Sequence, residues 1–367
     1  MKRLVICCDG TWKGLSSADP TNVAKTAYAV ARHDAAGVEQ IVFYSDGLGT
    51  RPSMIGRIGA LLGLGLDRSL EQAYRFLIFN YNGATETEPA DEIFMFGFSR
   101  GAYAVRSLVG LIRKCGILQR ENAAAVGEAL DLYRDSAALP VSRRHPDDPS
   151  SAASRAFHRQ YGVRHPRVKF LGLWDTVGAL GVPLRIPLSQ AMNRGFDFHD
   201  TRLSRIVDHA CHAVAIDEPR KVFDVTLIDD PVADGLKIDH AVEQMWFPGD
   251  HGSVGGGSAE KGLSDGTFAW MMTRAGAAGL ALDPACVMAP ANRPDPLAPF
   301  ERRIIKDRRN PLHYLYRALG AKARPLPDDA SQLDRSVFER WRRDPHYRPK
   351  HLAQKFGALL DRGFTDT

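Results

Sequence analysis

The chain has 367 residues, of which 44% are hydrophobic and 25% are charged. This composition is ordinary for a globular protein and excludes a mainly disordered chain, and the length suits one large α/β domain with insertions or two modest domains. The formal net charge of +5, from 48 Lys and Arg against 43 Asp and Glu, is too small and too evenly spread to indicate a nucleic-acid-binding protein.

The cysteines and the N-terminus exclude further classes. Five cysteines give an odd number, with no Cys-x-x-Cys pair and no Cys/His ligand spacing, so neither a disulfide framework nor a metal site is expected. The apolar run at residues 4–8 is too short for a signal peptide, and no stretch approaches the length of a membrane span. We therefore expect a cytoplasmic protein without metal or cofactor, for which export by a signal-independent secretion system stays open.

Short apolar runs alternate with amphipathic segments along the chain. Strands are predicted, in chain order, at residues 4–8, 40–44, 92–96, 168–173, 222–228 and 242–247. Helices are predicted at residues 22–36, 67–81 and 102–113, and residues 206–216 are interpreted as a helix or a helix-to-strand transition. Strands that give way in turn to helices predict the α/β class with a mostly parallel, doubly wound sheet.

Two irregular segments interrupt this alternation. The polar, Ala-rich stretch at about 119–165 predicts inserted helices and a loop, and the stretch at about 179–200, with its glycines and prolines, predicts a cap. Residues 1–290 are thus expected to form one domain with these insertions. Residues 291–367, rich in Pro, Arg and Asp, are expected to form a basic extension packed on the same domain. Its basic stretches, residues 302–309 and Trp341-Arg342-Arg343, are interpreted as solvated surface, with transient contact to the anionic headgroups of a membrane as the alternative.

Polar side chains come directly after the predicted strands. They are Asp9, Asp46, Ser99, Asp175 and His251. Because ligands of such sheets bind outside the carboxyl ends of the strands, these residues are expected to gather at one edge and to form the site there.

The pentapeptide Gly97-Phe98-Ser99-Arg100-Gly101 lies between a predicted strand and a predicted helix. This setting is typical of the nucleophile elbow of α/β-hydrolases, in which Ser99 would be the nucleophile. The chemistry accounts for the glycines, since a side chain two places either way would collide with neighbouring backbone. The N-terminus of the helix would stabilise an oxyanion. The alternative is a structural Gly-Ser-Gly turn.

A serine nucleophile needs a base, and His251 has the best setting among the twelve histidines. An apolar strand leads to His251 in a glycine-rich loop, from which its ring can reach a nucleophile. The alternative is a loop histidine at the start of a helix. His212 lies in an apolar segment and is expected to be a hydrogen-bonded core residue, and His240 a surface residue.

The third member must be a carboxylate that orients the imidazole. Asp175 follows a strong strand, and the chain order Ser, Asp, His is the one expected for α/β-hydrolases. Asp217 and Asp250 are rivals for this role, and Asp175 alternatively caps its own turn.

An oxyanion hole needs two backbone donors. One is expected to be the N–H of Arg100, and the other to come from the turn after the first strand, at Gly10 and Thr11, although a plain turn there is an open alternative. Candidate substrate-binding residues are Asp9, Trp12, Asp46 and Asp250; Asp46 alternatively closes a turn or contacts a metal.

In its motifs the chain resembles the α/β-hydrolase family that includes the type VI secretion phospholipase effectors. The matching stretches are, in order, residues 4–12 (LVICCDGTW), 94–103 (FMFGFSRGAY), 172–178 (GLWDTVG), 198–201 (FHDT), 212–218 (HAVAIDE), 246–249 (WFPG), 263–265 (LSD) and 347–349 (YRP). The resemblance implies an α/β-hydrolase acting on ester bonds, in known members the acyl esters of phospholipids. It also implies Ser99 as nucleophile, Asp175 as acid and His251 as base.

The chain departs from the family pattern near the histidine. Where the family usually has Asp two residues after the histidine and Tyr five residues further on, this chain has Ser253 and Ser258, and Lys13 replaces Asn after Trp12. The large extra domain of membrane-anchoring effectors is not expected.

These observations favour a serine esterase of the phospholipase A type, whose partner is a lipid or a small ester and not a nucleic acid. An esterase, thioesterase or amidase acting on a small soluble metabolite is one alternative. A binding protein that keeps the fold without catalysis is another, and the altered histidine loop motivates it.

Overall fold

Six strands of the described residues pair into one sheet, and each pairing between them is parallel. The computed structural model describes residues 1–10, 15, 17–47, 66–137, 152–178, 203–229, 241–289, 291–300 and 320–363. The strands are β1 Arg3–Cys8, β2 Gln40–Ser45, β3 Glu92–Phe98, β4 Val168–Trp174, β5 Val207–Ala215 and β6 Ala241–Phe247, and they lie in the order β2-β1-β3-β4-β5-β6.

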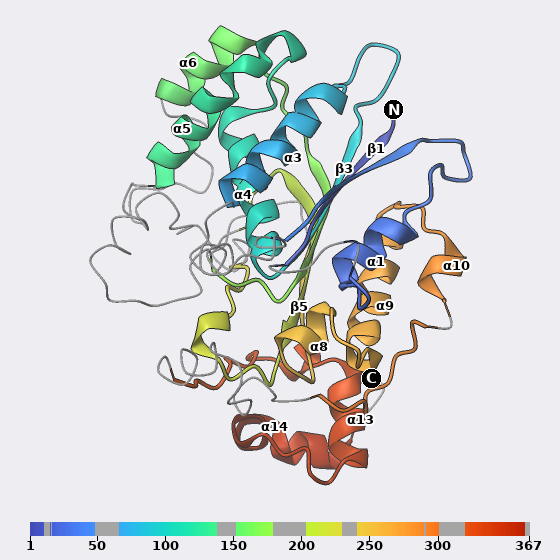
Figure 1. The fold of residues 1–367 in the computed structure, drawn as a ribbon. Coiled ribbons are helices and arrows are strands. Elements are labelled where there is room, and N and C mark those ends of the chain that lie inside the picture. Colours follow the sequence, from blue (N-terminus) through green and yellow to red (C-terminus); the bar gives the residue numbers. More distant parts are fainter. Residues whose placement is uncertain are drawn as a thin grey trace.

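Helices cover both faces of this sheet (Figure 1), which confirms the predicted α/β class and the doubly wound arrangement. One face carries α3 Leu66–Asn80 and α4 Arg100–Cys115, with η1 Arg120–Ala125, α5 Val126–Ala137 and α6 Ala152–Tyr161 packed around them. The other face carries α1 Asn22–Ala29, α9 Gly262–Ala277 and α10 Pro284–Val287. The short, glycine-rich helix α8, His251–Gly255, follows β6.

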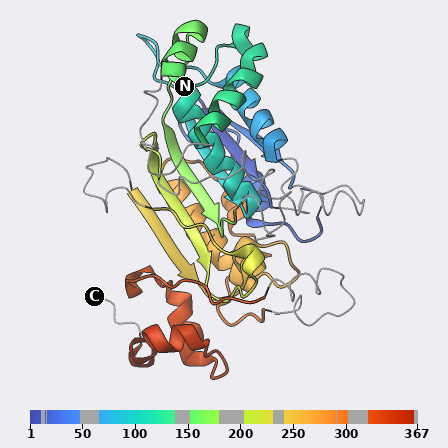
Figure 2. The same ribbon diagram turned by 90° about the vertical axis from the view of Figure 1, so that its left-hand side faces the viewer.

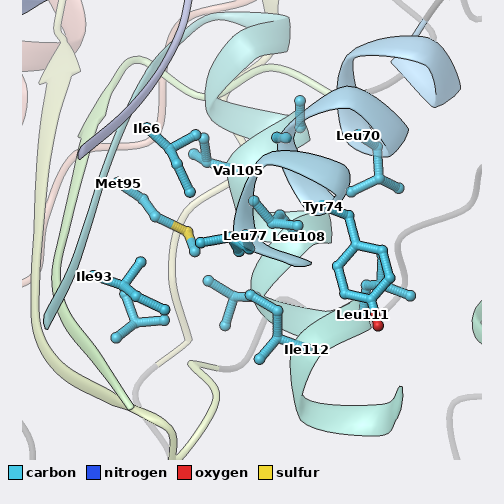
Figure 3. Close-up of a cluster of buried hydrophobic side chains, with 14 of the residues drawn as sticks. Ile6, Leu70, Tyr74, Leu77, Ile93, Met95, Val105, Leu108, Leu111 and Ile112 are labelled. Carbon is cyan, nitrogen blue, oxygen red and sulfur yellow. The ribbon is translucent and has the colours of Figure 1, made fainter. Parts of the chain in front are cut away.

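The core explains why β1 and β3 are apolar throughout. Successive strand residues point to opposite faces, so a strand covered on both sides needs an apolar residue at each position. On the face shown in Figure 3, Ile6 and Met95 pack against α3 and α4 through side chains such as Leu77 and Leu108. On the opposite face, aromatic rings of β3 and β4 pack against one another: the ring centroids of Phe96 and Phe170 lie 5.6 Å apart, in a tilted arrangement.

Two of the predicted elements are wrong, and the helix predicted at residues 22–36 ends at Ala29. Residues 207–215 form the inner strand β5, where a helix or a helix-to-strand transition was predicted, because a short run buried on both faces has no period that separates the two structures. Residues 222–228 are not a strand: they begin with the 3-10 turn η3, Lys221–Phe223, and continue beside the sheet, where Thr226 N–H donates to the carbonyl of Thr176 (2.8 Å). The predicted cap at 179–200 lies outside the described residues.

The C-terminal helices α13 Arg335–Arg343 and α14 Lys350–Arg362 lie at the end of the sheet toward which the strands point (Figure 2). Their buried side chains form a third apolar cluster with Val214, Ile216 and Trp246 of the β5–β6 region. Hydrogen bonds join the same parts, because Trp246 Nε1 donates to the carbonyl of Pro325 (3.1 Å). No helix among the described residues is long and apolar enough to cross a membrane.

The strand order reverses between β1 and β3. From β1 the chain moves outward to β2, and from β3 it moves the other way to β6. The two connections leave β1 and β3 in opposite directions, so the carboxyl ends of these strands are the topological switch point at which open α/β sheets bind ligands. Gly10 follows β1 at this point and Ser99 follows β3, so the fold itself sets the place of the candidate site.

Candidate active site

Ser99 lies at the sharp turn between β3 and α4. Its backbone has φ 58° and ψ −122°, a conformation that a residue with a side chain rarely adopts. The turn is held from the neighbouring strand, since Ser99 N–H donates to the carbonyl of Trp174 (3.0 Å). The N-terminus of the 16-residue helix α4 therefore points at the serine hydroxyl.

The two glycines of the pentapeptide are required by close backbone approach, as the sequence predicted. A Cβ on Gly97 would lie 2.5 Å from Cα of Ala102, and a Cβ on Gly101 would lie 2.0 Å from the carbonyl oxygen of Cys8. Both contacts are with main chain, which has no rotamer to relieve them. Glycine at these positions lets α4 start directly against β1.

His251 is the first residue of α8 and is buried. The carboxylate of Asp250 caps this helix by accepting from Ser253 N–H (2.9 Å). The imidazole ring lies between two phenyl rings, with centroids 4.6 Å from Phe98 and 4.8 Å from Phe223. Its Nε2 lies 2.8 Å from Oγ of Ser99.

Asp175 follows β4 and lies on the other side of the imidazole. Its Oδ2 is 2.6 Å from Nδ1 of His251, and its Oδ1 accepts from Ala215 N–H (3.0 Å). With Nδ1 donating to the carboxylate, Nε2 of a neutral imidazole is the acceptor that faces the Ser99 hydroxyl. The side chain of Asp175 has no exposed surface, and its backbone also has a positive φ, of 40°.

Arg324 is a member of this site that the sequence analysis did not find. Its Nη2 donates to Oδ2 of Asp175 (2.8 Å), and both side chains are buried. Burial by itself would raise the pKa of Asp175, but the Arg324 charge and the hydrogen bond from His251 outweigh it and hold that pKa well below the usual range of a carboxyl. Arg324 lies 149 residues after Asp175, and no motif marks it.

A second carboxylate supports the backbone of the histidine. Oε2 of Glu218 accepts from His251 N–H (3.2 Å), and Arg220 in turn pairs with Glu218 (2.6 Å). Burial opposes the charge of Glu218, but the hydrogen bond and the charge of Arg220 lower its pKa below the ordinary value. Glu218 lies within the HAVAIDE stretch, so its neighbourhood was marked in the sequence although its role was not.

The rival residues of the sequence analysis occupy other positions. Oδ2 of Asp217 accepts from Gly249 N–H (2.8 Å) and from the hydroxyl of Tyr347 (2.9 Å), and Asp250 caps α8. His212 is a core residue as expected, because it is fully buried and its Nε2 accepts from Thr176 N–H (3.1 Å). Burial, with the charge of Arg106, lowers the pKa of His212 to about 4, so this ring is neutral at pH 7. His240 lies outside the described residues.

The turn after β1 is partly described. The Asp9 carboxylate is buried and accepts from Gly10 N–H (2.6 Å) and from the hydroxyl of Tyr44 (2.5 Å). Asp46 is exposed and accepts a long hydrogen bond from Leu15 N–H (3.4 Å). Thr11 and Trp12 lie outside the described residues, as does Lys13. Arg100, the other expected oxyanion donor, is the first residue of α4, where backbone N–H groups point out of the helix end.

The altered histidine loop keeps a capped helix. Ser253, which replaces the usual aspartate, donates its hydroxyl to Oδ1 of Asp250 (2.8 Å). Ser258, which replaces the usual tyrosine, donates to the carbonyl of Glu260 (3.0 Å). The substitutions thus leave Oγ of Ser99 in hydrogen-bond reach of His251.

Comparison with known proteins gives the family. The model of the catalytic domain of Tle1-like phospholipase effectors of the type VI secretion system matches residues 2–274. The chain belongs to this family. The resemblance seen in the motifs is thereby confirmed, and Arg324 lies beyond the matched residues.

Individual relatives are distant and longer. An uncharacterized protein of Saccharomyces cerevisiae, YEL023C, is 29% identical over 238 residues, which are 60% of this chain and 32% of that protein. A crystal structure of an uncharacterized protein from Pseudomonas aeruginosa covers 79% of this chain and 48% of its own, at 18% identity and a TM-score of 0.43. The match to the structure of the Tle1 effector bound to the VgrG spike covers 70% of this chain and 51% of the chain in that structure, at 16% identity and a TM-score of 0.33. The chain therefore spans about a third to a half of the relatives it matches.

Proposed function

We propose that the protein hydrolyses carboxylic esters, and that its substrates are the acyl esters of phospholipids or similar lipids. The observation that carries the proposal is the imidazole of His251, which bridges Oγ of Ser99 (2.8 Å) and the buried carboxylate of Asp175 (2.6 Å). The family of phospholipase effectors supports the lipid substrate. We further propose that residues 1–290 and 291–367 act as one catalytic unit in the cytoplasm or after export.

In the first step Oγ of Ser99 attacks the acyl carbonyl, and Nε2 of His251 takes the serine proton. Asp175 keeps Nδ1 protonated and stabilises the imidazolium that forms. The negative charge that develops on the carbonyl oxygen lies at the N-terminus of α4, where the Arg100 N–H donates to it. We assign the second donor to Thr11, because the N–H of Gly10 already donates to Asp9.

The second step releases the alcohol and then the acid. His251 gives its proton to the oxygen of the leaving lysolipid or alcohol, and the C–O bond of the ester breaks. Water then attacks the acyl-enzyme, with His251 again taking the proton, and the fatty acid leaves as Ser99 regains its hydrogen. The proton transfers of both steps use Ser99, His251 and Asp175, whose side chains lie within hydrogen-bond distance of one another. Among the candidate substrate contacts, we keep Trp12 in that role. The Asp9 carboxylate accepts from Gly10 N–H in its own turn and Asp250 caps α8, so we no longer assign these two to substrate binding.

The test compares Ser99→Ala with a matched control. Ser107→Ala removes another buried hydroxyl of α4, two turns further along the same helix. We expect Ser99→Ala to lower kcat on phospholipid in mixed micelles by roughly 10⁴-fold or more, and Ser107→Ala to leave it within a few-fold of the unaltered enzyme. Mass spectrometry of the released fatty acid and lysolipid measures this.

The result that contradicts the proposal is equal turnover by Ser99→Ala and the unaltered enzyme. Good turnover of short monomeric esters without any gain on micelles would replace the lipid by a soluble ester as the substrate. A well-folded protein whose Ser99 is not labelled by a fluorophosphonate would point to the binding protein without catalysis.

A further inference from the structure

Arg324 reaches the site from a segment that is fixed on a loop beside the histidine. Ala321 forms an antiparallel bridge with Arg220, and Lys322 N–H donates to the carbonyl of Pro219 (2.9 Å). The Lys322 ammonium also pairs with Asp224 (2.7 Å). These contacts hold residues 321–324 along residues 219–224, so the guanidinium of Arg324 is delivered to the carboxylate by backbone that is itself held.

The guanidinium contacts two supports of the imidazole at once. Its Nη1 and Nη2 donate to Oδ1 and Oδ2 of Asp175 (3.2 and 2.8 Å), and Nη2 also donates to the carbonyl of Phe223 (2.6 Å). The ring of Phe223 packs on the imidazole of His251. Together with Ala215 N–H on Oδ1 and the imidazole on Oδ2, the two guanidinium donors fix the plane of this carboxylate.

The charges around His251 form two pairs. Asp175 is paired with Arg324, and Glu218, which accepts from the histidine N–H, is paired with Arg220. A further acidic group beside the histidine is Asp250, the cap of α8. Burial, followed by the charge of Glu218, raises the pKa of Asp250, so its negative charge is disfavoured. Each carboxylate that touches His251 thus has its own arginine.

We propose that Arg324 is a positioning residue for the hydrolysis, which orients Asp175 toward Nδ1 of His251 and offsets part of the carboxylate charge that favours a protonated imidazole. This inference rests on the proposed function of Ser99, Asp175 and His251. A protonated His251 cannot take the proton of Ser99. Arg324 therefore extends activity to lower pH, at the expense of some stabilisation of the imidazolium during the reaction.

Charge and geometry can be separated by two substitutions. Arg324→Gln removes the charge and the fork, whereas Arg324→Lys keeps the charge without the two parallel bonds. The matched control is Arg340→Gln in the same C-terminal segment. Arg340 is equally buried, but its Nη1 donates to the carbonyl oxygens of Pro296 and Ala298 (2.8 and 2.9 Å), away from the three residues.

The readout is the rate at which a fluorophosphonate labels Ser99, measured from pH 4 to pH 9 on the full chain, with thermal unfolding of each variant recorded beside it. For Arg324→Gln we expect labelling roughly 10- to 100-fold slower at the optimum and an acid limb moved to higher pH. Arg324→Lys is expected to label slowly with the acid limb in place. Arg340→Gln is expected to lose stability but to keep the rate and pH profile of the unaltered protein.

The outcomes separate this inference from the proposed function. If the unaltered protein is not labelled at Ser99, the proposed function fails and the role of Arg324 fails with it. If the unaltered protein is labelled and folded Arg324→Gln has the same acid limb, only the role of Arg324 is overturned. Should Arg324→Gln not fold, labelling of Arg324→Lys at the full rate would overturn the positioning role.

Discussion

At the scale of single residues, the strained non-glycine backbone of the described residues lies in the candidate site. Among the described residues, two residues other than glycine have a positive φ, and they are Ser99 and Asp175. Each such conformation costs about 1–3 kcal/mol and persists only where the surroundings hold it. Both residues are held by the neighbouring strands, Ser99 through the carbonyl of Trp174 and Asp175 through Ala213 and Ala215. Stability is thus given up where it orients the reacting groups.

The pair of Asp175 and Arg324 leads to a prediction at this scale. Asp175→Asn leaves the buried Arg324 guanidinium without a counter-charge, so we expect the free energy of unfolding to fall by about 3–5 kcal/mol. Combining it with Arg324→Met removes both charges and should restore much of that stability. Urea titrations followed by circular dichroism measure these changes.

Activity should behave differently from stability in this pair. We expect kcat to fall on the order of 10⁴-fold in Asp175→Asn, because an amide does not hold the imidazole in the required tautomer. The double variant should stay inactive although it is stable. An active double variant would show that Asp175 is not the acid of the site. If Asp175→Asn and the double variant were equally stable, the charges of Asp175 and Arg324 would not depend on each other for stability.

At the scale of elements, the turn between β3 and α4 depends on how closely α4 approaches β1. The residue at position 101 touches the main chain of Cys8 and Asp9, so the start of the helix is packed directly on the end of the neighbouring strand. The order β2-β1-β3 makes β1 and β3 neighbours, which brings the end of β1 and the start of α4 together. The geometry of Ser99 is therefore a property of two elements and not of the pentapeptide alone.

Two glycines that both lie in helices test this dependence. In Gly101→Ala the new methyl group would meet backbone at 2.0 Å, and we expect unfolding free energy to fall by roughly 3 kcal/mol or more, with loss of Ser99 labelling. Gly266 of α9 has no atom within 4 Å of the added Cβ, so Gly266→Ala should raise stability by about 0.5–1 kcal/mol and leave labelling unchanged. Thermal unfolding with labelling of the same samples compares them. Equal effects of the two substitutions would contradict the close approach of α4 to β1.

At the scale of the whole molecule, the C-terminal segment contributes to both the core and the site. Its helices bury Leu352 and Trp341 in a cluster with β5 and β6, and the segment before them carries Arg324 to Asp175. A further hydrogen bond joins Tyr347 to Asp217, which accepts from Gly249 two residues before His251. Loss of the segment would therefore remove part of the core and two supports of the site, at Asp175 and at Asp217.

A core substitution far from the site tests whether the molecule behaves as one unit. Leu352 of α14 is fully buried, so Leu352→Ala is expected to lower the unfolding free energy by about 2–5 kcal/mol. Because the same segment carries Arg324, unfolding and inactivation should coincide in a single transition at the lower temperature. Calorimetry beside activity measurements detects this. A first transition that leaves full activity would mean that the segment is not part of the catalytic unit.

Local patterns were sufficient for much of this description. β1, β3 and β4 are apolar at nearly every position because helices cover both of their faces, and these strands, like the edge strand β6, were predicted within one or two residues at their ends. The glycines around Ser99 marked its turn. The same uniform apolarity made β5 ambiguous, because a strand buried on both faces has no alternation to separate it from a short helix. Residues 222–228 were wrongly predicted as a strand, since a strand needs a neighbouring strand to pair with, and the sequence of a segment does not show whether the fold provides one.

The sequence by itself determined the fold class, the family and the three side chains Ser99, Asp175 and His251 as candidates, because each follows a strand and the parallel sheet brings strand ends together. Only the tertiary structure decided which carboxylate faces the imidazole, since Asp217 and Asp250 also follow strands in the sequence. It alone revealed Arg324 and Glu218 beside the site, because contacts between distant segments depend on packing and leave no local pattern. The physical reason is one of range: periodicity and turn chemistry act over a few residues, whereas the electrostatics of a buried carboxylate are set by whatever the fold places within hydrogen-bond distance of it.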